Sequence, residues 1–176
     1  MSVANNNSKY KIRTAHLDDA KALRDIKREV VRENEYLISV LEEFDENLEQ
    51  QSNWIQSVLE HNRETLIVAE VEGKVVGWLV FNSPTRKRLS HTGSFGMMIH
   101  KDYRGIGIGK KLITELLDWA EKNPLIEKVS LGVFCTNKRA ISLYKSMGFI
   151  EEGRKIKEIK LKDNEYVDDI LMYKLV

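Results

Sequence analysis

The sequence predicts an α/β fold, in which a mixed, mostly antiparallel central sheet is flanked by helices. Three observations lead to this prediction. Short runs rich in β-branched and apolar residues recur along the chain and are typical of strands. Apolar residues at helical spacing occupy the first third of the chain and the intervals between the later strands. Glycine and proline mark the breaks between these segments, and no segment repeats another.

The first part of the chain predicts one strand and two helices. Residues 10–14 alternate as a short strand does, and Asp18 or Asp19 then caps a helix with apolar residues at helical spacing. A second amphipathic helix is expected at residues 47–60. The form of residues 33–46, which mix acids with apolar side chains, stays open.

The rest of the chain supplies most of the sheet. Residues 65–71 and 75–82 predict two strands around a turn, in which Gly73 accepts a positive φ at little cost. The later elements follow in order: a strand at 92–99, a helix at 112–122, a strand at 128–134, a helix at 137–147, and strands at about 149–161 and 166–175. Three meandering strands followed by strand–helix–strand units predict a mixed sheet.

Length and composition describe one globular domain. The 176 residues carry a net charge of +1, so no global field favours nucleic acid or an anionic membrane as a partner. Cys135 is the single cysteine, which excludes an internal disulfide and fits a reducing compartment. The polar start resembles no signal peptide, and the longest apolar run is too short to span a bilayer. We expect a flexible tail at 1–9, one domain at 10–176 and a cytoplasmic location.

Residues 103–110, YRGIGIGK, join a predicted strand to a predicted helix and carry the clearest chemical signal. Free backbone N–H groups and the helix dipole favour an anion at such a junction. Alternate glycines let the backbone approach that anion closely. The surrounding basic residues are Lys101, Arg104, Lys110 and Lys111. The pattern predicts a pyrophosphate site.

Two other phosphate motifs do not fit this loop. A Walker A loop needs glycine where Arg104 stands and a hydroxyl residue where Lys111 stands. A dinucleotide fingerprint reads G-x-G-x-x-G, whereas this loop reads G-x-G-x-G followed by Lys110. A tight strand-to-helix turn without a ligand remains the alternative.

Two segments resemble the GCN5-related N-acetyltransferase (GNAT) superfamily, in its bacterial branch. Arg104-x-x-Gly107-x-Gly109 is similar to the R/Q-x-x-G-x-G/A loop, whose amides hold the coenzyme A pyrophosphate in that family. Residues 137–149, NKRAISLYKSMGF, resemble its N-x-x-A-x-x-L-Y-x-x-x-G-F segment. The resemblance covers residues 65–176. It implies the GNAT acyl-CoA N-acyltransferase fold and transfer of an acetyl group from acetyl-CoA to a primary amine, by direct attack in a ternary complex.

The resemblance also implies site residues. Tyr144 would protonate the departing thiolate, and it lies two helical turns after Asn137, on nearly the same face. The implied cofactor-binding residues are Met97, Met98, Ile99, Arg104, Gly105, Ile106, Gly107, Ile108, Gly109, Lys110 and Asn137. Structural alternatives stand beside these roles: a core strand for the two methionines, a helix cap for Asn137 and a buried core side chain for Tyr144.

The acceptor amine and the general base are left open. A small-molecule amine (amino acid, polyamine or amine antibiotic) is slightly favoured over a protein N-terminus or lysine. A non-catalytic acyl-CoA-binding regulatory module is the alternative of another class. The acceptor cleft is expected to combine the early helices, through Tyr36 and Trp54, with the last two strands. The strand at 92–99 has no carboxylate, where some relatives keep a glutamate, so the base candidates are Glu29, Glu33, Glu35 and Glu70.

Other residues carry weaker signals. The four histidines show no metal-ligand spacing, so no metal is expected. Cys135 lacks a neighbouring histidine and is interpreted as a small core residue. Arg86, Lys87 and Arg88 are interpreted as a solvated basic loop, with no nucleic-acid partner. The C-terminal hairpin offers a sheet edge at which a homodimer would form.

Overall fold

The computed structural model describes residues 10–44 and 47–176 and confirms the predicted fold class. The predicted tail at 1–9 lies outside the described residues. The strands are β1 Lys11–Thr14, β2 Thr65–Val71, β3 Lys74–Asn82, β4 Thr92–Ile99, β5 Lys128–Phe134, β6 Ile150–Lys162 and β7 Glu165–Leu175. The α-helices are α1 Ala20–Glu33, α2 Leu48–Glu60, α3 Ile108–Lys122 and α4 Lys138–Ser146.

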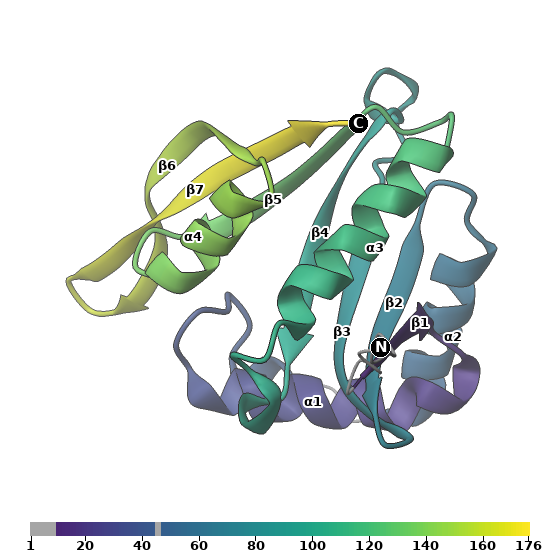
Figure 1. Cartoon of the computed structure of the whole chain (residues 1–176). Helices are drawn as coiled ribbons and strands as arrows, with labels where there is room; N and C mark the ends of the chain where they lie inside the picture. The colour runs from purple at the N-terminus through teal and green to yellow at the C-terminus, as the bar shows by residue number, and fades with distance from the viewer. Residues whose placement is uncertain (1–9, 45–46) are drawn as a thin grey trace, which may run out of the picture.

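One sheet runs through the described chain. Its seven strands follow the order β1-β2-β3-β4-β5-β7-β6, and only β4 and β5 are parallel neighbours. Two main cores lie on opposite faces of this sheet, and a small third cluster joins Phe134 of β5, Ile159 of β6 and Val167 of β7. One main core is built with the apolar faces of α3 and α4, and the other with those of α1 and α2. Figure 1 shows α3 and α4 in front of the strands.

The element bounds agree with the predicted ones except near the glycine-rich loop. The helix expected from residue 112 begins at Ile108, directly after Gly107. Gly107 has a φ of 92°, and this left-handed residue turns the loop straight into the first turn of α3. Residues 34–44, whose form the sequence left open, contain one short 3-10 turn at Leu41–Glu43.

Polar contacts fix the starts of the first two helices. Asn47 caps α2, since its side chain accepts hydrogen bonds from the amides of Glu49 and Gln50 at 2.9 and 3.2 Å. Asp19 precedes α1 as expected, but its carboxylate does not cap that helix. It accepts instead from the His16 amide at 2.7 Å and from Arg13 at 2.8 and 2.9 Å. Asp19 therefore ties the start of α1 to β1.

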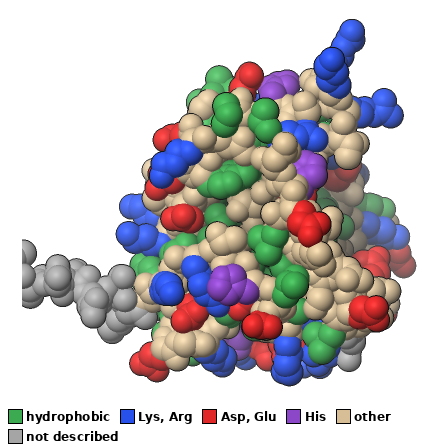
Figure 2. Space-filling view, turned by 90° about the vertical axis from the view of Figure 1, so that its right-hand side faces the viewer, with side chains coloured by type: hydrophobic (Ala, Val, Ile, Leu, Met, Phe, Trp, Pro, Cys, Tyr) green, Lys and Arg blue, Asp and Glu red, His purple; other side chains and the backbone are tan. Residues whose placement is uncertain are grey.

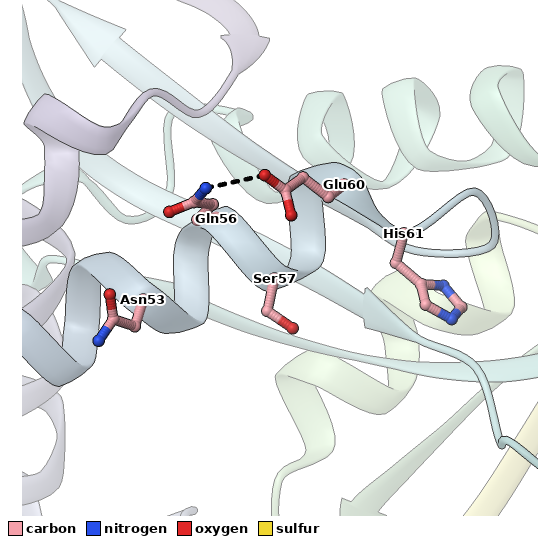
Figure 3. A pocket seen from close by; sticks show the side chains of 5 residues that line it. All are labelled: Asn53, Gln56, Ser57, Glu60 and His61. Atoms are coloured by element: carbon pink, nitrogen blue, oxygen red, sulfur yellow. Dashed lines mark hydrogen bonds between the residues drawn. The ribbon is translucent and has the colours of Figure 1, made fainter.

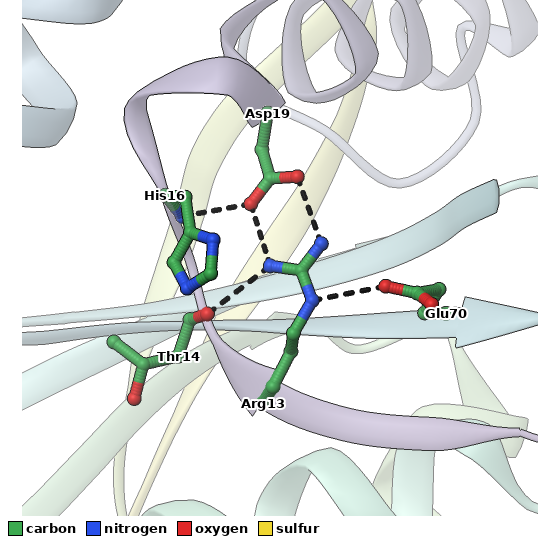
Figure 4. A network of polar contacts seen from close by, with 5 residues as sticks. All are labelled: Arg13, Thr14, His16, Asp19 and Glu70. Carbon is green, nitrogen blue, oxygen red and sulfur yellow. Dashed lines mark hydrogen bonds and ion pairs between the residues drawn. The ribbon is translucent and has the colours of Figure 1, made fainter. Parts of the chain in front are cut away.

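Arg13 is the centre of this network, which Figure 4 shows from close by. Besides the two bonds to Asp19, its Nε donates to Glu70 at 2.9 Å. Burial alone raises the pKa of Asp19, but the bonds from Arg13 and from the His16 amide outweigh burial, so the pKa lies below its ordinary value. The network thus joins β1, β2 and α1 through a largely buried charge.

Replacing Arg13 with methionine is expected to lower the free energy of unfolding by about 2–3 kcal/mol at pH 7, because Asp19 then stays buried without its partner. A carboxylate with a lowered pKa stabilises the fold above its unfolded pKa, and this contribution is lost as the pH falls through the folded pKa. The difference between the two proteins should therefore shrink towards pH 3. Urea unfolding at both pH values measures it, and an unchanged difference would contradict the assignment.

The surface and the helices add two observations. On the side of the molecule seen in Figure 2, Lys and Arg side chains are interspersed with Asp and Glu, so this face has no continuous basic area. Among the described residues, no helix combines the length and the apolar character needed to cross a bilayer.

Candidate active site

β4 and β5 pair at one end only, and this is the structural feature that defines the candidate site. Three residue pairs join them: Thr92 with Lys128, Gly93 with Val129, and Ser94 with Ser130. Beyond these pairs the two strands diverge (Figure 1). We call the space between residues 95–99 of β4 and 131–134 of β5 the β4–β5 wedge.

Both edges of the wedge carry backbone groups without a partner strand. The His100 amide donates to the Val76 carbonyl at 2.9 Å. Pairing alternates along an antiparallel ladder, so Met98 bonds to β3 while Met97 and Ile99 direct their amides and carbonyls into the wedge. The same alternation on β5, fixed by the bond from the Cys135 amide to the Asp168 carbonyl, directs the backbone of Gly132 into it. An extended guest with amide groups would fit there as an additional strand.

The glycine-rich loop lies at the open end of the wedge, where β4 ends and α3 begins. Gly105 and Gly107 have φ values of 82° and 92°, which other residues rarely adopt. The first amides of α3 have no partner within the helix and favour an anion. A β-carbon on Gly109 would lie 3.3–3.4 Å from side-chain atoms of Met97, Ile99 and Leu143. Glycine at this position allows α3 to pack closely against β4 and α4.

The side chain of Arg104 is engaged in a structural contact. Its two terminal nitrogens bond to the two carboxylate oxygens of Glu33 at 2.7 Å each, and its Nε donates to the Ile99 carbonyl at 2.8 Å. These contacts hold the loop against the end of α1 and the end of β4. Its charge is matched by Glu33, so Arg104 would serve an anion mainly by shaping the loop.

Arg139, which the sequence analysis did not single out, reaches the loop from the first turn of α4. One terminal nitrogen lies 3.3 Å from the position that a β-carbon on Gly105 would occupy. Arg139 is exposed and forms no ion pair within the described chain. It therefore places a cation without an ion-pair partner beside the glycine-rich loop. Arg139 stands at a variable position of the N-x-x-A-x-x-L-Y motif, so the sequence did not indicate that it lies beside the loop.

Tyr144 approaches the wedge from the α4 side. Its ring packs edge-on against Phe95 of β4 and Phe149, with centroids 5.8 and 6.1 Å apart. Burial raises the pKa of Tyr144 to about 12, so its hydroxyl stays protonated at neutral pH. Asn137, two turns earlier, caps α4 by accepting from the Ala140 amide at 3.2 Å. The predicted proton donor thus lies close to the edge of β4 that faces the wedge.

The four glutamates considered as general bases lie on α1, after α1 and on β2, outside the wedge. Glu33 is paired with Arg104, Glu70 with Arg13 at 2.9 Å, and Glu29 with His100 at 3.0 Å. Glu35 is exposed on the segment after α1. Each of the three paired carboxylates has a local structural partner.

The two residues expected to contact the acceptor lie in different surroundings. Trp54 packs edge-on against Trp78 at 5.9 Å, in the core between α2 and the sheet. Tyr36 is 45% exposed on the segment between α1 and α2. The structure leaves Tyr36 accessible and places Trp54 in the core cluster against which Met98 of β4 also packs.

A shallow hollow runs along α2, away from the wedge (Figure 3). Its lining residues come from one face of the helix and its end: Asn53, Gln56, Ser57, Glu60 and His61. Gln56 donates to Glu60 at 2.8 Å, which satisfies two of these groups locally. Within the described ranges, no three His, Cys, Asp or Glu side chains are grouped to hold a metal. The wedge and its loop, which combine free backbone groups with a cation and a buried tyrosine, are therefore the better candidate for an active site than this hollow.

Comparison with known proteins agrees with this geometry. Residues 23–149 match the model of the Acetyltransferase (GNAT) family, and the chain belongs to that family. The L-amino acid N-acetyltransferase AaaT of Escherichia coli is 33% identical over 106 residues, which cover 60% of this chain and 65% of AaaT. The chain thus spans just under two thirds of that relative.

Two further relatives cover nearly the whole chain. An N-alpha-acetyltransferase of the archaeon Sulfurisphaera tokodaii is 28% identical over 178 residues, covering 94% of this chain and 90% of the relative. The crystal structure of an acetyltransferase of the GNAT family from Streptococcus pneumoniae superposes with a TM-score of 0.89 at 25% identity, covering 95% and 99% of the two chains. The archaeal match means that the resemblance is not restricted to a bacterial branch.

Proposed function

We propose that the protein is an N-acetyltransferase that uses acetyl-CoA and acetylates a primary amine by direct attack in a ternary complex. The β4–β5 wedge is the observation that carries this proposal. Pantetheine is extended and contains two amides, so it fits between the free backbone edges of Met97 and Gly132 as an additional strand. Its pyrophosphate then reaches the amides of residues 105–110.

The wedge also supports the chemistry of transfer. A neutral amine attacks the acetyl carbonyl, forming the C–N bond, and the Met97 amide stabilises the oxyanion. The C–S bond then breaks, and the sulfur takes the proton of the Tyr144 hydroxyl. One proton leaves the ammonium before attack, and the nitrogen releases a second proton to solvent as the intermediate collapses. Solvent then returns a proton to the Tyr144 oxygen. The reaction yields the amide, free coenzyme A thiol and one released proton.

The acceptor we favour is a small-molecule amine. The similarity to an L-amino acid N-acetyltransferase supports this choice. The similarity to an archaeal N-alpha-acetyltransferase keeps a protein N-terminus as the second candidate. The presence of Tyr144 beside the wedge argues against a non-catalytic acyl-CoA-binding module.

Calorimetric titration of acetyl-CoA is the first test, followed by a panel of amino acids, polyamines, amine antibiotics and N-terminal peptides, scored by thiol release. Binding followed by thiol release with one acceptor class supports the proposal. No binding by the folded protein would overturn it. Binding without thiol release from any amine would favour the regulatory module.

Arg139→Ala is expected to weaken acetyl-CoA binding roughly 10-fold, because a charged contact with a phosphate is lost. Added salt should weaken wild-type binding more steeply than binding by the variant. Lys138→Ala removes the neighbouring exposed cation and serves as the control. Calorimetry at two salt concentrations measures both effects, and equal affinities of wild type and Arg139→Ala would refute this role.

The remaining proposals concern the whole molecule. One continuous sheet through the described residues supports a single N-acetyltransferase domain at 10–176. The single Cys135 supports a reducing, cytoplasmic location. β6 is the outer strand of the sheet and exposes Ile150 and Ile156, which favours pairing with a second copy at this edge.

A further inference from the structure

Asp169 of β7 lies on the face of the sheet opposite α3 and α4. Ile170 and Met172 belong to the core beneath those helices. Side chains alternate between the two faces of a strand, so Asp169 projects to the other side. On that side α1 and α2 pack mainly against β2, β3 and β4. Asp169 therefore lies on the less covered half of this face, next to β5.

The carboxylate of Asp169 extends over Gly132, on the β5 edge of the wedge. Its two oxygens lie 3.0 and 3.1 Å from the position that a β-carbon on Gly132 would occupy. Any larger residue at position 132 would displace the carboxylate. Glycine thus makes room for a negative charge beside the backbone groups that face the wedge.

No side chain in the described part of the chain forms an ion pair or hydrogen bond with Asp169. The nearest charges come from β6, where Lys155 lies opposite Asp169 in the register but bonds to Glu158 at 3.3 Å. Burial raises the pKa of Asp169, and Lys155 and Glu158 act on it in opposite directions. Asp169 is thus a half-buried carboxylate that accepts a backbone hydrogen bond from Val133 but has no cation bonded to it among the described side chains. A carboxylate in such a place is a candidate for binding a cationic ligand.

We propose that Asp169 binds the ammonium form of the acceptor amine at the open face of the β4–β5 wedge. This inference rests on the proposed acetyltransferase function and names one residue of its acceptor site. Tyr144 belongs to the core on the α4 side, so acceptor and proton donor meet the thioester from opposite faces. The acceptor class is then an amine that is cationic at neutral pH, such as an α-amino group, a polyamine or a lysine-like side chain.

Asp169→Asn tests this role with little change in shape. With the amine of the panel that wild type acetylates fastest, KM for that amine should rise about 10- to 100-fold, while the Kd of acetyl-CoA stays unchanged. In wild type, KM should also rise as the pH falls through the raised pKa of Asp169, and the variant should lose this pH dependence.

Asp168→Asn is the matched control on the same strand. Asp168 accepts from the Lys157 amide at 2.8 Å and from Arg154 at 3.4 Å, within the β6–β7 hairpin. An asparagine keeps an acceptor oxygen there, so KM for the amine should stay near the wild-type value.

Three outcomes would count against the inference. An unchanged KM and pH profile in Asp169→Asn would overturn it and leave the acetyltransferase function in place. Joint loss of acetyl-CoA affinity and amine affinity would assign Asp169 a structural role instead. A wild type that binds acetyl-CoA but acetylates no amine would overturn the proposed function, and this inference with it.

Discussion

Tyr144→Phe is expected to lower kcat by roughly 10²–10⁴-fold while the Kd of acetyl-CoA stays nearly unchanged. The phenylalanine ring keeps the edge-on contacts with Phe95 and Phe149, so the wedge retains its shape. Only the hydroxyl is lost, and with it the proton for the departing sulfur. Single-turnover measurements of thiol release separate this step from binding.

The pH profile gives a second test of Tyr144. Burial raises its pKa to about 12, so the phenol stays a proton donor at every pH below that value. We therefore expect no loss of wild-type activity between pH 8 and 10 through deprotonation of Tyr144. Tyr166→Phe, a change on the exposed end of the β6–β7 hairpin, should leave kcat unaltered. A coenzyme A thiol has an ordinary pKa near 8.5, so a less than threefold loss in Tyr144→Phe would show that the thiolate leaves unaided.

Local patterns predicted the elements of this fold well, because each depends on neighbouring residues. Short runs rich in β-branched and apolar residues gave the strands β2 to β5, and helical spacing gave α1 and α2. The start of α3 was predicted four residues late, because its first turn lies within the glycine-rich motif and has few apolar residues to reveal it.

The wedge itself was not predictable from strand patterns. A strand keeps the same side-chain alternation whether or not its neighbour pairs with it. The sequence of residues 95–99 therefore does not reveal that this part of β4 lacks pairing with β5. The structure shows both the divergence of the two strands and which backbone groups face it. Met97 and Ile99 point into the wedge, whereas Met98 pairs with β3.

The partners of the charged residues depend on contacts between segments far apart in the sequence, which local patterns do not predict. Arg104 and Glu33 are 71 residues apart, and nothing in either local sequence indicates that they form a bidentate pair. The contacts of Arg139 with Gly105 and of Asp169 with Gly132 also join residues far apart in the sequence, so local patterns could not predict them. Asp168 and Asp169 have different surroundings because adjacent strand residues face opposite sides of the sheet, and this difference requires knowledge of the register.

Gly107→Glu is expected to weaken acetyl-CoA binding on the order of 100-fold or more. Gly107 has a φ of 92°, which side-chain-bearing residues rarely adopt, and its β-carbon would lie 3.3 Å from the Tyr10 hydroxyl, so any side chain strains the loop and crowds Tyr10. The new carboxylate would also stand at the start of α3, where the pyrophosphate is expected, and like charges in contact cost several kcal/mol. Calorimetry with acetyl-CoA measures the loss of affinity directly.

Gly73→Glu provides the matched control, because it introduces the same charge at a similar backbone geometry. Gly73 has a φ of 79° in the turn between β2 and β3, and a β-carbon there meets no atom within 4 Å. Both variants should lower the melting temperature through backbone strain, yet only Gly107→Glu should lose affinity for acetyl-CoA. Equal losses of affinity would indicate general destabilisation, whereas wild-type affinity in Gly107→Glu would place the phosphates away from this loop.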